Sequence, residues 1–168
     1  MKIINQYVLK GHQFTFALPT LKDKSLLVEG FKKLSTLSKH YRFHSPKASL
    51  TTQEVNFFLD VDDYDHFAIG ALEKIKEKVH GIAFIRYIRD TTDATTAEVA
   101  LAIVDSHHRL GLGSKLYSEL IEHAKNNNIK TFTHYILNEN RGMLNLLKKF
   151  DATFSQGFSG TTKVTVSL

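Results

Sequence analysis

The chain contains no cysteine, and this absence removes several kinds of chemistry. Disulfide bonds, thiolate metal sites and a cysteine nucleophile are all excluded. A reducing intracellular setting suits such a composition, so we expect a cytoplasmic protein. The chain also lacks any run near the roughly 18 apolar residues that cross a membrane, and its first residues form no long apolar core. We therefore expect no membrane partner and no signal peptide.

Internal repeats, low-complexity segments and blocks rich in lysine and arginine are absent as well. The net charge is +5, but the basic residues are dispersed along the chain. A groove for a nucleic-acid strand needs clustered basic residues interleaved with aromatic ones, so we expect no nucleic-acid partner. With 168 residues, of which 42% are hydrophobic, the chain is expected to form one domain over residues 1–168.

The stretch from His107 to Leu116 reads HHRLGLGSKL and contains two closely spaced glycines. An apolar run over 98–104 precedes it, and apolar residues at helical spacing follow it. The pattern predicts a strand, a glycine turn and a helix whose first N–H groups are unpaired at the positive end of its dipole. Gly111 and Gly113 allow a ligand to approach this backbone closely. Together these features predict a seat for an anion, usually a phosphate.

Two common phosphate motifs do not match this turn. The dinucleotide fingerprint requires a third glycine where the chain has Leu116. The P-loop requires lysine before serine or threonine, whereas Lys115 follows Ser114. An ordinary flexible turn is the alternative interpretation.

The remaining pattern predicts alternating strands and helices. Capping boxes at Thr20–Asp23 and Thr51–Glu54 each predict a helix start, and Asn140 is a good N-cap for a later helix. Residues 35–46 read as a polar connection, and 73–78 read as a charged turn. Strands are expected at 14–18, 67–72, 79–88, 97–104 and 129–137, with a closing hairpin at 152–158 and 161–168.

The glycine stretch resembles the acyl-CoA pyrophosphate loop of the GNAT N-acetyltransferase superfamily. That loop has the pattern Gln/Arg-x-x-Gly-x-Gly/Ala, and this chain has His108 at the first position, followed by Gly111 and Gly113. Asn140-x-x-Met143-Leu144 resembles the later helix of the family, which flanks the pantetheine arm.

Further stretches resemble the catalytic domain of bacterial protein lysine acetyltransferases. These are Ala97-Glu98-Val99-Ala100, the Leu34–Phe43 segment and Asp62-x-x-Asp65-His66. The resemblance covers most of residues 14–158. It implies an α/β fold of the α+β type, with a mixed, mostly antiparallel sheet of about six to seven strands and flanking helices. The central parallel strands splay apart to admit the cofactor.

Acetyl-CoA is therefore the expected co-substrate. The turn amides and the helix dipole suit its pyrophosphate, and Arg109 and Lys115 add positive charge. The resemblance implies that the backbone of the preceding strand pairs with pantetheine, that one amide there polarises the thioester carbonyl, and that Asn140 hydrogen-bonds the arm. The candidate cofactor-binding residues are Ile103, Val104, His108, Arg109, Leu110, Gly111, Leu112, Gly113, Ser114 and Asn140.

Glu98 is the candidate catalytic base. An amine must be neutral to attack the thioester, and a lysine with pKa ~10.4 is neutral about once in 2,500 molecules at pH 7. Glu98 is the one ionisable residue of an otherwise apolar strand, a setting that suits proton transfer, directly or through water. The resemblance places the family's catalytic glutamate at this position. The alternative is an edge residue that faces solvent.

Other chemical roles find less support in the sequence. Many family members use a tyrosine on the later helix as general acid, and the matching position is Leu147. Tyr117 and Tyr135 are substitutes, although packing is favoured for both. Among the nine histidines, His40 and His44 are four residues apart, but no carboxylate or third ligand lies at metal-site spacing, so no metal is expected.

The expected activity is transfer of acetyl from acetyl-CoA to a primary amine. The acceptor is a protein lysine, as the resemblance implies, or a small amine held in an acidic pocket that residues 60–65 could line. A non-catalytic acyl-CoA sensor and a basic DNA-binding domain are alternatives from other classes. For the oligomeric state, the sequence is compatible with a homodimer as well as with a monomer.

Overall fold

A single mixed sheet runs through the computed structural model, which describes all residues from 1 to 168. In chain order the strands are β1 (Lys2–Leu9), β2 (His12–Leu18), β3 (His66–Ile75), β4 (Lys78–Arg89), β5 (Thr96–Ile103), β6 (Thr131–Leu137), β7 (Ala152–Gln156) and β8 (Thr161–Ser167). The α-helices are α1 (Lys24–Lys33), α2 (Thr36–Phe43), α3 (Thr52–Leu59), α4 (Leu112–Asn126) and α5 (Arg141–Leu147). Two short 3₁₀ turns, η1 (Leu21–Asp23) and η2 (Asp105–His107), precede α1 and follow β5.

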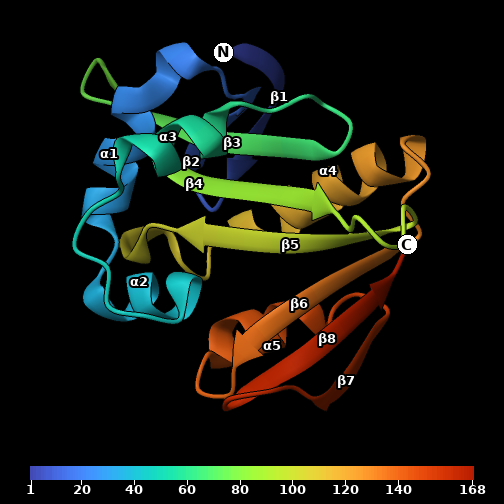
Figure 1. The fold of residues 1–168 in the computed structure, drawn as a ribbon. Helices are drawn as coiled ribbons and strands as arrows, with labels where there is room; N and C mark the ends of the chain where they lie inside the picture. The colour runs from blue at the N-terminus through green and yellow to red at the C-terminus, as the bar shows by residue number, and fades with distance from the viewer.

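The strand order is β1-β2-β3-β4-β5-β6-β8-β7, and every neighbouring pair except one is antiparallel. The exception is β5 with β6, which pair in parallel only from Thr96 to Glu98. Beyond Glu98 the two strands diverge toward α2 and α5 (Figure 1). This divergence exposes an edge of β5 inside the sheet, and it confirms the expected fold with splayed parallel strands.

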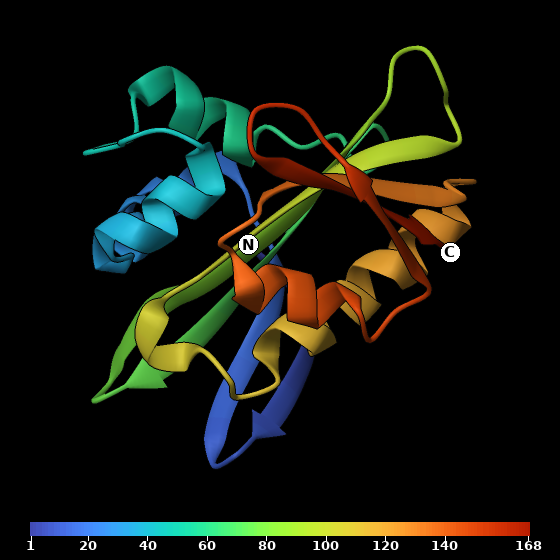
Figure 2. The ribbon, with the colours of Figure 1, turned by 90° about the horizontal axis from the view of Figure 1, so that it is seen from below.

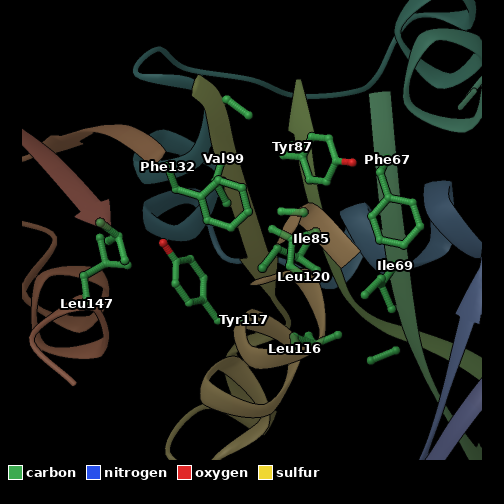
Figure 3. Close-up of a cluster of buried hydrophobic side chains, with 14 of the residues drawn as sticks. Phe67, Ile69, Ile85, Tyr87, Val99, Leu116, Tyr117, Leu120, Phe132 and Leu147 are labelled. Carbon is green, nitrogen blue, oxygen red and sulfur yellow. The ribbon is translucent and has the colours of Figure 1, made fainter. Parts of the chain in front are cut away.

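Helices cover both faces of the sheet. Helices α1, α2 and α3 lie on one side, and α4 and α5 lie on the other (Figure 2). The main core lies under α4, where Leu116, Tyr117 and Leu120 point toward Ile85 and Val99 of the sheet (Figure 3). None of the helices combines the length and the apolar composition of a membrane span.

Two elements are missing from the sequence prediction, the helix α2 and the strand β1. The segment from Ser35 to Pro46 is not a polar connection, because Ser35 caps the helix α2 by accepting a hydrogen bond from Ser38 N. Strand β1 is not predicted from the sequence, because it is an edge strand whose side chains are mostly exposed and give no clear apolar pattern. The sheet therefore has eight strands rather than six to seven. Both capping boxes form as predicted, at Thr20–Asp23 and at Thr51–Glu54.

His134 lies at the point where β5 and β6 part. Its side chain is almost fully buried, its Nε2 is 2.8 Å from Tyr117 Oη, and it also hydrogen-bonds the backbone of Val99. Burial lowers the pKa of His134 to about 3, although the bond to Val99 opposes this shift. A neutral imidazole therefore holds the two strands at their branch point.

This burial predicts a specific loss of stability in acid. Below pH 6.5 an unfolded His134 takes up a proton that the folded chain excludes until about pH 3. The free energy of unfolding should therefore fall between these values, by up to about 1.4 kcal/mol per pH unit from this group. Denaturant titrations at several pH values give the free energy of unfolding as a function of pH. This free energy should fall less steeply toward acid for His134→Gln than for wild type. The control His108→Gln, at an exposed site, should show the wild-type pH dependence. Equal slopes in wild type and His134→Gln would contradict the assignment.

Candidate active site

A groove of about 460 Å³ lies between the open edge of β5, the start of α4 and helix α5, with α2 closing one side. Seven of the ten candidate cofactor residues line this groove, and they come from three separate segments of the chain. They are Ile103, His108, Arg109, Gly111, Gly113, Ser114 and Asn140.

The glycine turn forms one end of the groove. Gly111 is the N-cap of α4 with φ of 88°, a left-handed conformation that suits glycine. A Cβ on Gly113 would lie 3.2 Å from Ile103 Cδ1 and 3.3 Å from Leu146 Cδ2, so the absence of a side chain keeps β5 and α5 close. The first amides of α4 have no partner within the helix. The turn can therefore present several N–H groups to one anion.

The charges around the turn differ in part from the prediction. Arg109 lines the groove, as does Lys149, whose Nζ is 3.5 Å from Ser114 Oγ. Lys115 was expected to contribute charge, but its Nζ instead lies 4.3 Å from the centre of the Tyr7 ring and 3.8 Å from a carboxylate oxygen of Glu119. The cationic contribution from this region therefore comes from Arg109 and Lys149.

The edge of β5 supplies backbone groups, but not those of both expected residues. Val104 N donates to Ile82 O at 2.9 Å, and Val104 is buried away from the groove, so its amide is not free for a ligand. Because backbone polar groups alternate in direction along a strand, Ile103 and Leu101 direct theirs toward the groove. Ile103 O already lies 2.9 Å from His108 Nε2. Leu101, which the prediction omitted, takes the place assigned to Val104.

Leu110 and Leu112 have structural positions in the turn. Leu112 is fully buried in the main core, and Leu110 packs against that core. Neither residue lines the groove. Their side chains anchor the turn, which is why apolar residues alternate with the glycines.

Helix α5 forms the opposite wall. Asn140 caps it, with its Oδ1 accepting from Met143 N at 3.1 Å, which leaves the side-chain NH₂ group of Asn140 available to a ligand. Tyr41 of α2 reaches across to the same end of α5, where its hydroxyl donates to Glu139 O at 3.2 Å. Sequence reasoning missed Tyr41 as a groove residue because it treated residues 35–46 as a connection.

Glu98 is an exposed residue of β5, and it is the last residue of β5 that pairs with β6. It does not line the groove itself, and it lies three residues before Leu101, which is about 10 Å along the strand. This exposure agrees in part with the alternative interpretation of a residue that faces solvent, although β5 is not an edge strand. Exposure is what a group needs if it must meet an amine arriving from solvent.

Two arginines accompany Glu98 on the same face of the sheet. Arg86 of β4 pairs with Ala100, two residues beyond Glu98, and its guanidinium lies 4.6 Å from the Phe58 ring. Burial lowers the pKa of Arg42 to about 10, and the charge of Glu98 opposes this shift. Burial, and then repulsion from Arg42, lower the pKa of Arg86 to about 10. Arg86 Nε and Nη1 have no hydrogen-bond partner. The surroundings of Glu98 are therefore positive rather than acidic.

The candidate general acids do not reach the groove. Tyr117 is fully buried, as is Leu147 at the position where many family members have a tyrosine, and burial raises the pKa of Tyr117 well above its usual value. Tyr135 packs against Phe158, with ring centres 5.1 Å apart. These positions agree with the packing roles favoured from the sequence.

Asp105, the first residue of the turn η2, connects this turn to the start of α2. Its carboxylate accepts hydrogen bonds from Ser35 N at 2.9 Å, Ser35 Oγ at 2.7 Å and Ser38 Oγ at 2.8 Å. Burial alone would raise the pKa of Asp105, but these bonds lower it below its ordinary value of 3.8. The ionised carboxylate is thus the form that holds α2 beside the turn.

We expect Asp105→Ala to lower the free energy of unfolding by about 1–2 kcal/mol near pH 7, since hydrogen bonds to a charged group are lost. The wild-type advantage should be complete above pH 3.8 and vanish as pH falls through the lower folded pKa. Thermal melts of both proteins over this range measure the difference. Asp151→Ala serves as a control for removing a carboxylate, and an unchanged melting temperature in Asp105→Ala would contradict the assignment.

Comparison with known proteins agrees with this geometry. The model of the acetyltransferase (GNAT) family matches residues 32–152. The chain belongs to the GNAT acetyltransferase family. Members of this family use acetyl-CoA as the acetyl donor.

One curated relative and two solved structures show which members of the family this chain is similar to. Acetyltransferase Pat of Mycolicibacterium smegmatis is 28% identical over 132 residues, which cover 79% of this chain but only 39% of that protein. The GNAT domain of S. lividans PAT superposes with a TM-score of 0.89 at 27% identity, covering 98% of this chain and 96% of that one. YncA, a putative acetyltransferase from Salmonella typhimurium solved with its cofactor acetyl-CoA, shares the fold with a TM-score of 0.71 at 14% identity over 92% of each chain. The likenesses to Pat and to the GNAT domain of S. lividans PAT confirm the resemblance to the lysine acetyltransferase catalytic domain.

Proposed function

We propose that residues 1–168 form one acetyltransferase domain that transfers acetyl directly from acetyl-CoA to the ε-amine of a protein lysine. Glu98 takes the proton from the amine, through water if needed, as the new C–N bond forms. The C–S bond then breaks, and the CoA thiolate leaves. The observation that carries this proposal is the exposed position of Glu98 where β5 and β6 part, on the strand whose free edge lines the groove.

The groove supports one orientation of acetyl-CoA. The pyrophosphate would rest on the α4 amides of the glycine turn, with Arg109 and Lys149 supplying positive charge. Pantetheine would follow the edge of β5 at Leu101 and Ile103, as an added strand does. Asn140 would donate its free side-chain N–H to the arm from the other wall.

The structure offers little support for a small cationic acceptor. The acidic stretch 60–65 was a candidate lining for such a pocket, but Asp62 accepts from the backbone N–H groups of Tyr64, Asp65 and His66. Asp65 pairs with Arg89 at 2.7 Å. Neither carboxylate lines the groove or the smaller apolar cavity beside it.

The charge beside Glu98 favours an acceptor that carries negative charge near its amine. Arg42 lines the groove, and Arg86 lies on the same sheet face as Glu98. A carboxylate next to the reacting lysine would be attracted by the charge of these guanidinium groups, whereas a second cation would be repelled. We therefore propose lysines that neighbour aspartate or glutamate as acceptors.

Release of free CoA from acetyl-CoA tests this proposal. Two peptides with one lysine each are compared with the triamine spermidine. The lysine is flanked by aspartate in one peptide and by arginine, a cation that is not itself an amine acceptor, in the other. We expect kcat/KM to be highest for the acidic peptide, by about tenfold, and Arg42→Gln to reduce this preference. Faster turnover of spermidine would assign a small-molecule acceptor. Binding of acetyl-CoA without turnover of any acceptor would favour the sensor alternative.

A further inference from the structure

Three side chains from distant segments converge outside the groove. His12 begins β2, Glu73 lies near the end of β3, and His107 ends the turn η2 that leads into the glycine stretch. Glu73 Oε1 is 2.8 Å from His12 Nδ1, and Glu73 Oε2 is 2.8 Å from His107 Nε2. The three sets of ligand atoms all lie within 4.8 Å of one another.

The cluster contains a charge that the transfer reaction does not use. Glu73 and His107 are each only 8% exposed, whereas the His12 side chain is 40% exposed. No lysine or arginine pairs with Glu73, and its salt-bridge partners are the two imidazoles. The buried carboxylate therefore depends on positive charge at the place where the three groups meet.

The donor set has the composition of a zinc site. Two imidazole nitrogens and one carboxylate oxygen are ligands that zinc prefers, and calcium and magnesium prefer oxygen. Zinc holds such atoms at about 2.0–2.2 Å, so tetrahedral ligands lie roughly 3.4 Å apart. The separations in the cluster, between 2.8 Å and 4.8 Å, span this value.

The surroundings also orient the ligands. His107 Nδ1 lies 2.9 Å from Ser106 Oγ, which can hold the tautomer that leaves Nε2 free for an ion. His12 presents Nδ1 to the cluster from the exposed side, so an ion can enter and a water molecule can complete the coordination.

We propose that His12, Glu73 and His107 bind one zinc ion. This conclusion differs from the expectation of no metal, which was drawn from spacing along the chain, because the three ligands come from separate segments.

The ion would brace the turn of the cofactor groove. His107 is followed directly by His108 and Arg109, and Lys10 of the β1–β2 hairpin already donates to Arg109 O at 2.7 Å. Zinc would add a second connection from this hairpin, through His12, to the segment that positions the glycine turn. Its role is structural, and the proposal does not depend on the acetyl-transfer assignment.

Calorimetric titration of the untagged, chelator-treated protein with zinc chloride tests the site. We expect one ion per chain, no competition from magnesium, and the visible spectrum of tetrahedral cobalt when Co²⁺ replaces Zn²⁺. His12→Ala should weaken zinc binding by more than about 100-fold, beyond what loss of an outer hydrogen-bond partner costs. Because His12 is at an exposed hairpin, this variant should keep the fold, as circular dichroism would check.

The control is His44→Asn, which removes an exposed imidazole elsewhere at a left-handed position that asparagine tolerates. It should bind zinc as wild type does. Saturating zinc should also raise the melting temperature of wild type by about 5 °C and that of His12→Ala by much less. No stoichiometric zinc binding by wild type, or equal binding by wild type and His12→Ala, would overturn the proposal and leave a proton-bridged histidine–glutamate cluster.

Discussion

Replacing Glu98 with glutamine is expected to lower kcat for acetyl transfer by about 10²–10⁴-fold, the usual contribution of a positioned base. The side chain keeps its size and its exposed place on β5, so acetyl-CoA affinity should not change. Stopped-flow measurement of CoA release, together with calorimetric titration of acetyl-CoA, separates these two effects.

The pH dependence of the variant gives a second readout. Without a base the reaction depends on the small neutral fraction of the acceptor lysine, which grows tenfold per pH unit below its pKa of about 10.4. Turnover by Glu98→Gln should therefore rise steeply with pH, whereas wild type should be less sensitive. Glu122→Gln, on the surface of α4, is the matched control and should retain wild-type kinetics. Normal turnover by Glu98→Gln would show that another group is the base.

The second large effect is expected at the glycine turn. Gly111→Val should weaken acetyl-CoA binding by about 100-fold, because the strained turn no longer aligns its amides with the pyrophosphate and two charge-assisted hydrogen bonds are worth about 3 kcal/mol. The strain arises because Gly111 has φ of 88°, which a branched side chain adopts only at a cost.

Gly160 provides a matched control for this strain. It has φ of 74° in the β7–β8 turn, and a Cβ at either glycine would meet nothing within 4 Å. Gly160→Val and Gly111→Val should therefore lose similar stability, at least the roughly 1–2 kcal/mol of a left-handed residue. Only Gly111→Val should lose acetyl-CoA binding. Equal affinities in the two variants would contradict the placement of the pyrophosphate.

Local signals predicted much of the fold. Paired capping residues at Thr20 and Thr51 act over three residues, so both helix starts could be read directly. Helix α2 was missed because Ser35 and Asp105, which fix its start, are far apart in the chain. The turn between β3 and β4 is shorter than the sequence predicts, because only Lys76 and Glu77 separate the two strands, both in left-handed conformations.

The site was predictable where it depends on one contiguous segment. The glycine turn follows from its own sequence, including the apolar residues that anchor it. The free edge of β5 depends on register, which decides that Leu101 and Ile103 face the groove while Val104 bonds to Ile82. The convergence of His12, Glu73 and His107 depends on three segments, and no spacing along the chain could indicate it.

The position of bound acetyl-CoA is the most direct measurement of the central claim. A crystal structure of the chain with acetyl-CoA should place the pyrophosphate on the α4 amides between Leu110 and Ser114, with pantetheine along Leu101 and Ile103. The acetyl carbon should then lie at the end of the groove nearest Glu98. Acetyl-CoA bound elsewhere, or a chain that binds none at millimolar concentration, would contradict the account.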